Sequence, residues 1–172
     1  IAEDRFVAGH LYAGTDDGLL QVSTDDGNTW TIVSDKLPGL PKDSWINTIE
    51  VSSHHAGTAY VAINNYRNND FNNYIYKTSN GGKTWESVAG DLPANRVARV
   101  LREDPKNPDL LYLGTELGLF VSFNGGKNWV ELKNNMPTLP FNDLVIHPRD
   151  NDLILASHGR GVWILDILSA LQ

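Results

Sequence analysis

Aromatic and charged side chains that could bind a ligand gather in one polar stretch, NNYRNNDFNN, at residues 64–73. The ring of Tyr66 could stack against a sugar or a peptide, while Arg67 and Asp70 could hydrogen-bond to its polar groups. A long polar connection of this kind either binds a ligand or is a plain surface loop. We therefore take Tyr66, Arg67 and Asp70 as candidate ligand-binding residues.

A second candidate cluster lies near the C-terminus, where SHGRG places His158 and Arg160 in a glycine-rich turn. Both side chains can donate hydrogen bonds to an oxyanion, so the pair predicts a site for an anion such as a carboxylate. In the alternative interpretation, the glycines only shape the turn and Arg160 pairs with an acid of a neighbouring unit.

The composition narrows the class of partner. With 14 Lys and Arg against 21 Asp and Glu, the net charge is −7, which argues against nucleic acid. No apolar run has the length of a membrane span, so we expect no membrane insertion. The chain contains no Cys and shows no His or acidic spacing typical of metal ligands, so we expect no metal and no cofactor.

The elements that must position these residues repeat along the chain. Three phrases share one pattern: STDDGNTW (23–30), TSNGGKTW (78–85) and SFNGGKNW (122–129). Their tryptophans are 55 and 44 residues apart. Short segments rich in Val, Leu, Ile and Tyr, such as LLYLGT and LILAS, separate turn residues and indicate strands. A unit of about 44 residues with four such strands is typical of a propeller blade.

The sequence therefore predicts an all-β fold, a partial β-propeller of about 3.5 to 4 four-stranded antiparallel blades. We expect the whole chain, 1–172, to form one propeller segment with approximate blades at 1–37, 45–92, 96–136 and 141–172. A closed propeller has typically four to eight blades, and an open one leaves two uncovered edges. We therefore expect either that two copies associate into a ring or that the chain is a fragment of a longer propeller.

The repeated phrase favours a structural role, because a turn is needed in every blade and a catalytic group only once. An Asp or Asn can accept hydrogen bonds from backbone N–H groups two residues on, a Gly supplies positive φ, and the Trp can cover the turn. The residues expected in these roles are Asp25, Gly27, Trp30, Asn80, Gly82, Trp85, Asn124, Gly126 and Trp129.

These three phrases resemble the Asp-box, or BNR repeat, of sialidases, xyloglucanases, sortilin-type receptor domains and bacterial proteins described as glycosyl hydrolases. The segment DLVIHPRDNDLILASHGRGVWILD (143–166) resembles the C-terminal part of the large bacterial BNR or sortilin-like proteins. The resemblance implies a propeller fold, and a secreted or periplasmic location. It does not decide the activity, since enzymes and non-enzymes share the box.

A glycosidase needs two carboxyl groups about 5 to 10 Å apart. Because the chain has 21 acidic residues, such pairs arise by chance. The candidates are Asp16, Asp17, Asp43, Asp70, Glu116 and Asp143. No complete catalytic set is identified, so an enzymatic role stays open, with glycoside hydrolysis as the reaction if there is one.

The geometry of a meander separates the boxes from the expected site. Turns between strands three and four lie at one end of a blade, and turns between strands two and three lie at the other, where propellers collect binding residues. First strands line the channel. Aligning Ser53-His54, Asp104-Pro105 and His147-Pro148 brings Thr48, Arg99 and Asn142 to equivalent positions, two residues before Glu50, Leu101 and Leu144.

We conclude from the sequence that the chain is a propeller scaffold that binds a carbohydrate or protein ligand. The candidate ligand-binding residues are Tyr66, Arg67, Asp70, Arg99, Asn142, His158 and Arg160. The alternative is part of a BNR-type glycoside hydrolase whose site needs further blades or a second copy.

Overall fold

The computed structural model describes residues 1–133, 135–166 and 168–172, and these form strands, turns and three short 3₁₀ helices. The strands make four antiparallel sheets, in each of which consecutive strands lie side by side. Three sheets have four strands and the last has three. The expected all-β partial propeller is therefore confirmed, and we number its blades one to four from the N-terminus.

Each blade is a simple meander. Blade one contains β1 (Ala2–Glu3), β2 (Leu11–Gly14), β3 (Leu20–Ser23) and β4 (Thr31–Ile32), followed by η1 (Ser34–Lys36). Blade two contains β5 (Trp45–Val51), β6 (Ala59–Asn65), η2 (Tyr66–Asn68), β7 (Asp70–Thr78) and β8 (Glu86–Ser87). Blade three contains β9 (Ala98–Glu103), β10 (Leu111–Thr115), β11 (Gly118–Ser122) and β12 (Val130–Glu131). Blade four contains β13 (Phe141–Ile146), β14 (Leu153–Ser157) and β15 (Val162–Leu165), and η3 (Leu168–Ala170) follows it.

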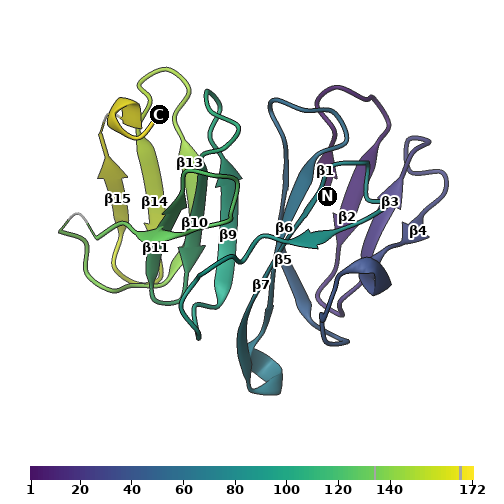
Figure 1. Ribbon diagram of the computed structural model, residues 1–172, viewed down its shortest axis with the longest axis horizontal. Coiled ribbons are helices and arrows are strands. Elements are labelled where there is room, and N and C mark those ends of the chain that lie inside the picture. The colour runs from purple at the N-terminus through teal and green to yellow at the C-terminus, as the bar shows by residue number, and fades with distance from the viewer. Residues whose placement is uncertain (134, 167) are drawn as a thin grey trace.

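The blades stand next to one another in chain order, and the arrangement is open (Figure 1). The first strand β9 packs against β5 on one side and β13 on the other, so first strands line the inner side of the arc. In Figure 1 the purple blade one and the yellow blade four lie at opposite sides of the molecule.

Three apolar cores lie between consecutive blades. Tyr12 and Leu20 of blade one pack with Val61 and Trp85 of blade two. The second core joins Tyr60, Ile75, Leu113 and Trp129, and the third joins Tyr112, Val121, Phe141 and Leu155. Every residue of β6, β10 and β11 is buried, which explains why apolar residues follow one another in these strands instead of alternating with polar ones, and why polar residues occur only at their C-terminal ends.

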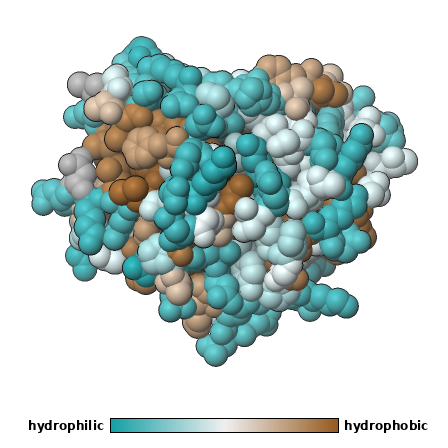
Figure 2. Space-filling view, in the orientation of Figure 1, coloured by the Kyte–Doolittle hydropathy of each residue, from teal (hydrophilic) through white to brown (hydrophobic). Residues whose placement is uncertain are grey.

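The outer face of blade four is uncovered. Val162 and Ile164 of β15 are 64% and 61% exposed, whereas Leu119 and Val121, at the corresponding register positions of β11, are 1% and 2% exposed. Figure 2 shows a hydrophobic area on this side of the molecule, over the C-terminal sheet. The exposed face of blade four thus corresponds to the face that blade three buries against the next blade along the chain.

The polar stretch at residues 64–73 is mostly regular structure. It prolongs β6 and β7 into a hairpin that projects beyond the other blades (Figure 1), and only η2 and Asn69 form the turn. Asn69 has a φ of 58°, the left-handed conformation that Asn tolerates in tight turns. The sequence predicts an expanded loop here, and the physical reason for the difference is that Asn65 and Asp70 pair across the hairpin and extend the two strands.

Candidate ligand-binding site

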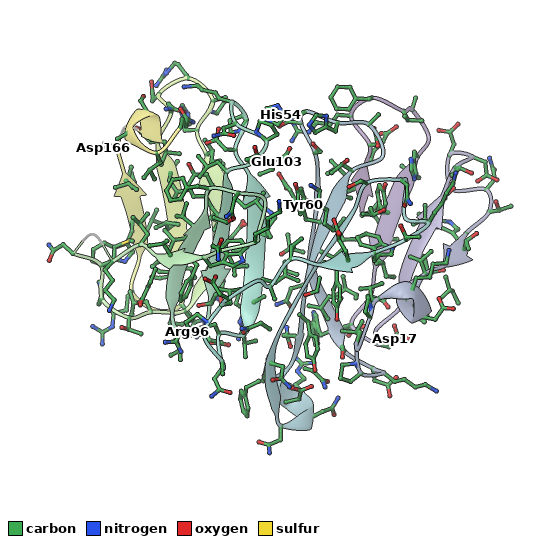
Figure 3. The ribbon with its side chains drawn as sticks, in the orientation of Figure 1. Asp17, His54, Tyr60, Arg96, Glu103 and Asp166 are labelled. Carbon is green, nitrogen blue, oxygen red and sulfur yellow. The ribbon has the colours of Figure 1, made fainter. Side chains whose placement is uncertain are left out.

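The two ends of the blades carry different turns. Figure 3 shows His54 and Glu103 at one end and Asp17 and Arg96 at the other. The boxed turns share the first end with the turns between first and second strands, since the Gly81 N–H donates to the carbonyl of Gly57 at 2.8 Å. We name this the box end, and the opposite end the mouth.

In each box the side chains form a closed hydrogen-bond pattern. Asp25 Oδ1 accepts from the N–H of Thr29, four residues on, at 2.8 Å, and not from the residue two positions on that we expected. The Gly27 N–H donates instead to the Ser23 hydroxyl, at 2.9 Å. The box therefore needs a Ser or Thr two residues before the Asp or Asn, because this hydroxyl reaches the glycine N–H.

The other two boxes repeat this geometry with Asn in place of Asp. Thr84 N–H donates to Asn80 Oδ1 at 3.0 Å, and Asn128 N–H donates to Asn124 Oδ1 at 2.9 Å. The amide oxygen serves as the acceptor in both cases, and Gly82 and Gly126 have φ values of 80° and 90°. The boxed turns point away from the mouth, and the third also hydrogen-bonds to the segment that follows β8, since the Trp129 N–H donates to Asp91 Oδ1 at 2.7 Å.

A cavity of about 350 Å³ lies at the mouth. Its lining consists of Tyr66, Arg99, Glu116, Pro140, Asn142 and His158. Four of the seven candidate residues, from blades two, three and four, thus meet in one place. Tyr66 and His158 are far apart in the sequence, but they lie close together because blade two and blade four flank blade three on its two sides.

Arg99 is the centre of this lining. Its guanidinium group forms an ion pair with Glu116, and its Cζ lies 5.1 Å from the centroid of the Tyr66 ring. The Arg99 and Glu116 side chains are 24% and 31% exposed, so both remain accessible to a ligand. Next to them, Arg67 lies 3.7 Å above the Trp45 ring, a cation–π contact at the edge of the mouth.

The first strands of blades two, three and four each contain a bulge. The pairing with the second strand skips Asn47 in β5, Arg99 in β9 and Asn142 in β13. Such bulges redirect a side chain, and they recur beside binding sites. Arg99 and Asn142 are equivalent, as we expected, but their counterpart is Asn47 and not Thr48.

The error in register has a local cause. Ser52 opens the turn after β5 through the hydrogen bond of its N–H to the Thr58 carbonyl, and Asp104 makes the same bond to Leu110. The sequence-based alignment of Ser53 with Asp104 therefore displaces blade two by one residue. In the structure, Asn47 receives a hydrogen bond from Asn64 at 2.6 Å and donates one to the Ala98 carbonyl at 3.0 Å.

The other three candidates do not line the cavity. Asp70 stabilises the hairpin by accepting hydrogen bonds from Asn65 at 2.9 Å and from the Tyr74 hydroxyl at 2.7 Å. Partial burial works against ionisation, but these hydrogen bonds prevail and lower the pKa of the Asp70 carboxyl. Arg67 is exposed on the hairpin and Arg160 is exposed in the turn after β14.

Two lining residues were not among the candidates. Glu116 appeared only among the acids considered for catalysis, and Pro140 belongs to a connector that we did not consider for binding. The signal that could have found Glu116 is its place in the turn after β10, directly after the last residue of that strand. Its pairing with Arg99 depends on the bulge, which no local pattern in the sequence predicts.

A second cavity, of about 260 Å³, lies at the box end, where Arg5, Glu50 and Arg102 face it. Burial raises the pKa of the Glu50 carboxyl to about 7, although Arg102, 3.5 Å away, opposes the shift. Glu103 beside it is buried and accepts hydrogen bonds from the Ser52 hydroxyl at 2.8 Å and the Ser53 N–H at 2.7 Å. The cluster is thus largely satisfied by its own hydrogen bonds and ion pairs.

Among residues 1–133, 135–166 and 168–172, no group of three or more His, Asp or Glu side chains is placed to hold a metal ion. The helices in the same ranges are all too short to span a membrane.

Comparison with known proteins matches residues 18–161 to Sortilin-Vps10, described as sortilin, neurotensin receptor 3. A xyloglucanase of Hypocrea jecorina (strain QM6a) is 30% identical over 131 residues, which cover 69% of this chain and 15% of that protein. The GH74 enzyme of Niastella koreensis has a similar structure, with a TM-score of 0.70 at 18% identity over 95% of this chain and 27% of that one. YCF48 bound to D1 peptide has a TM-score of 0.64 at 15% identity, over 91% of this chain and 47% of that one.

These matches confirm the resemblance to Asp-box propellers that the repeated phrases indicated. The chain spans only 15% of the xyloglucanase it matches. The two structural likenesses, both under 25% identity, establish the fold.

Proposed function

Because this chain belongs to the Sortilin-Vps10 family, we propose that it is the part of a propeller that binds a carbohydrate at the mouth of the channel. The observation that carries this proposal is the meeting of Tyr66, Arg99 and Glu116 in one accessible cavity. The likeness to a xyloglucanase supports a saccharide as the ligand class.

The lining suits a sugar chemically. The paired guanidinium and carboxylate of Arg99 and Glu116 offer hydrogen-bond donors and acceptors side by side, which matches neighbouring sugar hydroxyls. The flat ring of Tyr66 offers a stacking surface for the C–H face of a sugar. Asn142 and His158 add exposed polar groups on the opposite side of the cavity.

Carbohydrate binding can be tested by titrating the protein with xyloglucan oligosaccharides and following heat or NMR shifts. Tyr66→Ala should weaken binding about tenfold or more, as expected for loss of a stacking ring. Phe71→Ala is the matched control, because Phe71 is a 45% exposed aromatic of the same hairpin outside the cavity. Equal affinities of the two variants would refute the site.

A peptide ligand is the second candidate, and the structural likeness to YCF48 bound to D1 peptide favours it. The same titration with short acidic peptides distinguishes a peptide ligand from a carbohydrate ligand. A peptide ligand would be recognised by Arg67 and Arg99, so its affinity would fall as salt rises, whereas that of a neutral sugar would not.

Hydrolysis would require more than this chain. Glu116 is the one carboxylate among the described residues that line the mouth cavity, and a glycosidase needs two. We propose that any second carboxylate comes from further blades or from a second copy. Release of reducing sugars from xyloglucan by this chain alone, abolished by Glu116→Gln, would show instead that the chain is catalytic by itself.

We further propose that other blades cover the outer faces of blades one and four. The exposed Val162 and Ile164 on one side and Trp30 on the other support this proposal. These blades belong either to a longer chain, consistent with the small share of the relatives that is matched, or to a second copy.

A further inference from the structure

A groove in blade one is distinct from the mouth cavity and has no counterpart of its size in blade three. Its volume is about 380 Å³, and Leu19, Ile32, Leu40 and Pro41 form its apolar part. Leu19 and Ile32 are 36% and 52% exposed. The groove lies between the turn after β2, strand β4 and the connector that leads to blade two.

Blade three provides an internal comparison for this groove. Its equivalent cavity holds only about 100 Å³. By strand register, Gly118 stands where blade one has Leu19, and Glu131 stands where it has Ile32. The repeat therefore does not require apolar residues at these two positions, and their presence in blade one calls for another explanation.

The walls of the groove are held in place before any ligand arrives. The Leu20 N–H donates to the Ser34 hydroxyl at 2.7 Å, and the Ser44 hydroxyl donates to the Pro41 carbonyl at 2.7 Å. A side chain at Gly18 would lie 3.0 Å from the Cα atom of Asp43, so only glycine lets the turn pack so closely on the connector. A preformed groove loses little entropy when it binds.

The rim of the groove is acidic. Asp17, Asp35 and Asp43 surround it, and Lys42 is the one basic residue among its lining. In blade three, by contrast, Glu131 is paired with Lys133 at 3.5 Å, so the local charge is balanced. The potential at the blade-one groove therefore favours a cationic partner.

We propose that this groove binds a segment of another protein in which an aliphatic or aromatic side chain is flanked by lysine or arginine. The apolar side chain would fill the space between Leu19 and Ile32, and the basic residues would face the acidic rim. The aliphatic lining has no aromatic platform, which disfavours a sugar, and the acidic rim disfavours an anionic membrane surface. This inference is independent of carbohydrate binding at the mouth.

The test uses labelled peptides with the core Lys-Leu-Lys, compared with Glu-Leu-Glu and Lys-Ser-Lys, followed by anisotropy and by amide NMR shifts. We expect binding of Lys-Leu-Lys alone, with shifts centred on the groove. Ile32→Glu, which installs the residue of blade three, should weaken binding at least about tenfold. Val130→Glu is the matched control, since Val130 is 58% exposed on β12 and lies outside the groove.

Three outcomes would overturn the proposal. The first is no binding of the Lys-Leu-Lys peptide at concentrations up to about 1 mM. The second is a lack of specificity, seen either as equal loss of binding in Ile32→Glu and Val130→Glu or as equal binding of the Glu-Leu-Glu or Lys-Ser-Lys peptide. The third is a change in molar mass caused by Ile32→Glu but not by Val130→Glu, which would show that the groove contacts a second copy of the chain. Tyr66→Ala should leave peptide binding unchanged.

Discussion

The indole N–H of Trp129 donates a hydrogen bond to the backbone carbonyl of Val88, at 3.0 Å, across the interface between blades three and two. The box tryptophan thus joins its blade to the preceding one. Trp85 lies likewise in the core between blades two and one, where its ring meets that of Tyr12 edge-on at 6.4 Å. Trp30, in the first of the four blades, is 36% exposed and donates to the carbonyl of Gly27 in its own turn.

Removing an interface tryptophan should destabilise the protein. We expect Trp85→Ala to lower the free energy of unfolding by about 3 kcal/mol or more, because a large buried aromatic leaves a cavity. Trp30→Ala, the same change at an exposed position, should cost less than about 1 kcal/mol. Urea unfolding measures both, and similar losses would show that the box tryptophan acts only within its own turn.

The first box should make stability depend on acidity. Hydrogen bonds from the Thr29 hydroxyl and N–H, and from the Ser23 hydroxyl, hold the pKa of the Asp25 carboxyl below its ordinary value of 3.8. Stability gained this way is present above that value and is lost as the pH falls through the lower, folded-state pKa. Below pH 3.8, the melting temperature of Asp25→Asn should therefore change less with pH than that of the wild type. Identical acid profiles would contradict this assignment.

Glu50 should make the protein less stable as the pH rises, which is the opposite of the effect of Asp25. Its pKa is raised from 4.5 to about 7 by burial, so its contribution to stability is complete below 4.5 and is lost as the pH rises to about 7. As the pH rises between these limits, the free energy of unfolding of the wild type should fall by on the order of 2 kcal/mol relative to that of Glu50→Gln. Denaturant unfolding at several pH values checks this, and Glu86→Gln, an exposed acid on β8, serves as the control.

The uncovered face of blade four should drive association. We expect the molar mass from light scattering to exceed 19.0 kDa as concentration rises, since exposed apolar faces self-associate. Ile164→Lys should suppress this increase, because it places a charge on the open face, while Val130→Lys should not. A molar mass of 19.0 kDa at all concentrations would show that this exposed face does not drive association.

Part of the mouth could be predicted from the sequence. Arg99 and Asn142 were placed together by aligning strand ends, because a repeat of regular strands carries equivalent residues to equivalent places. Tyr66 and His158 were predicted only as residues of turns that face the same end. The pairing of Arg99 with Glu116 was missed, since it depends on a one-residue bulge, and a bulge has no reliable local signature.

The sequence by itself determined the all-β class, the repeat and the four-stranded meander, because turn glycines, box residues and short apolar strands are local signals that every copy repeats. Only the tertiary structure decided what lies between the copies. The Ser23 hydroxyl and the Gly27 N–H could be paired only once the turn geometry was known. The placing of Trp129 against Val88, and the groove beside Ile32, depend on how neighbouring blades and connectors pack, and that packing joins residues far apart in the chain.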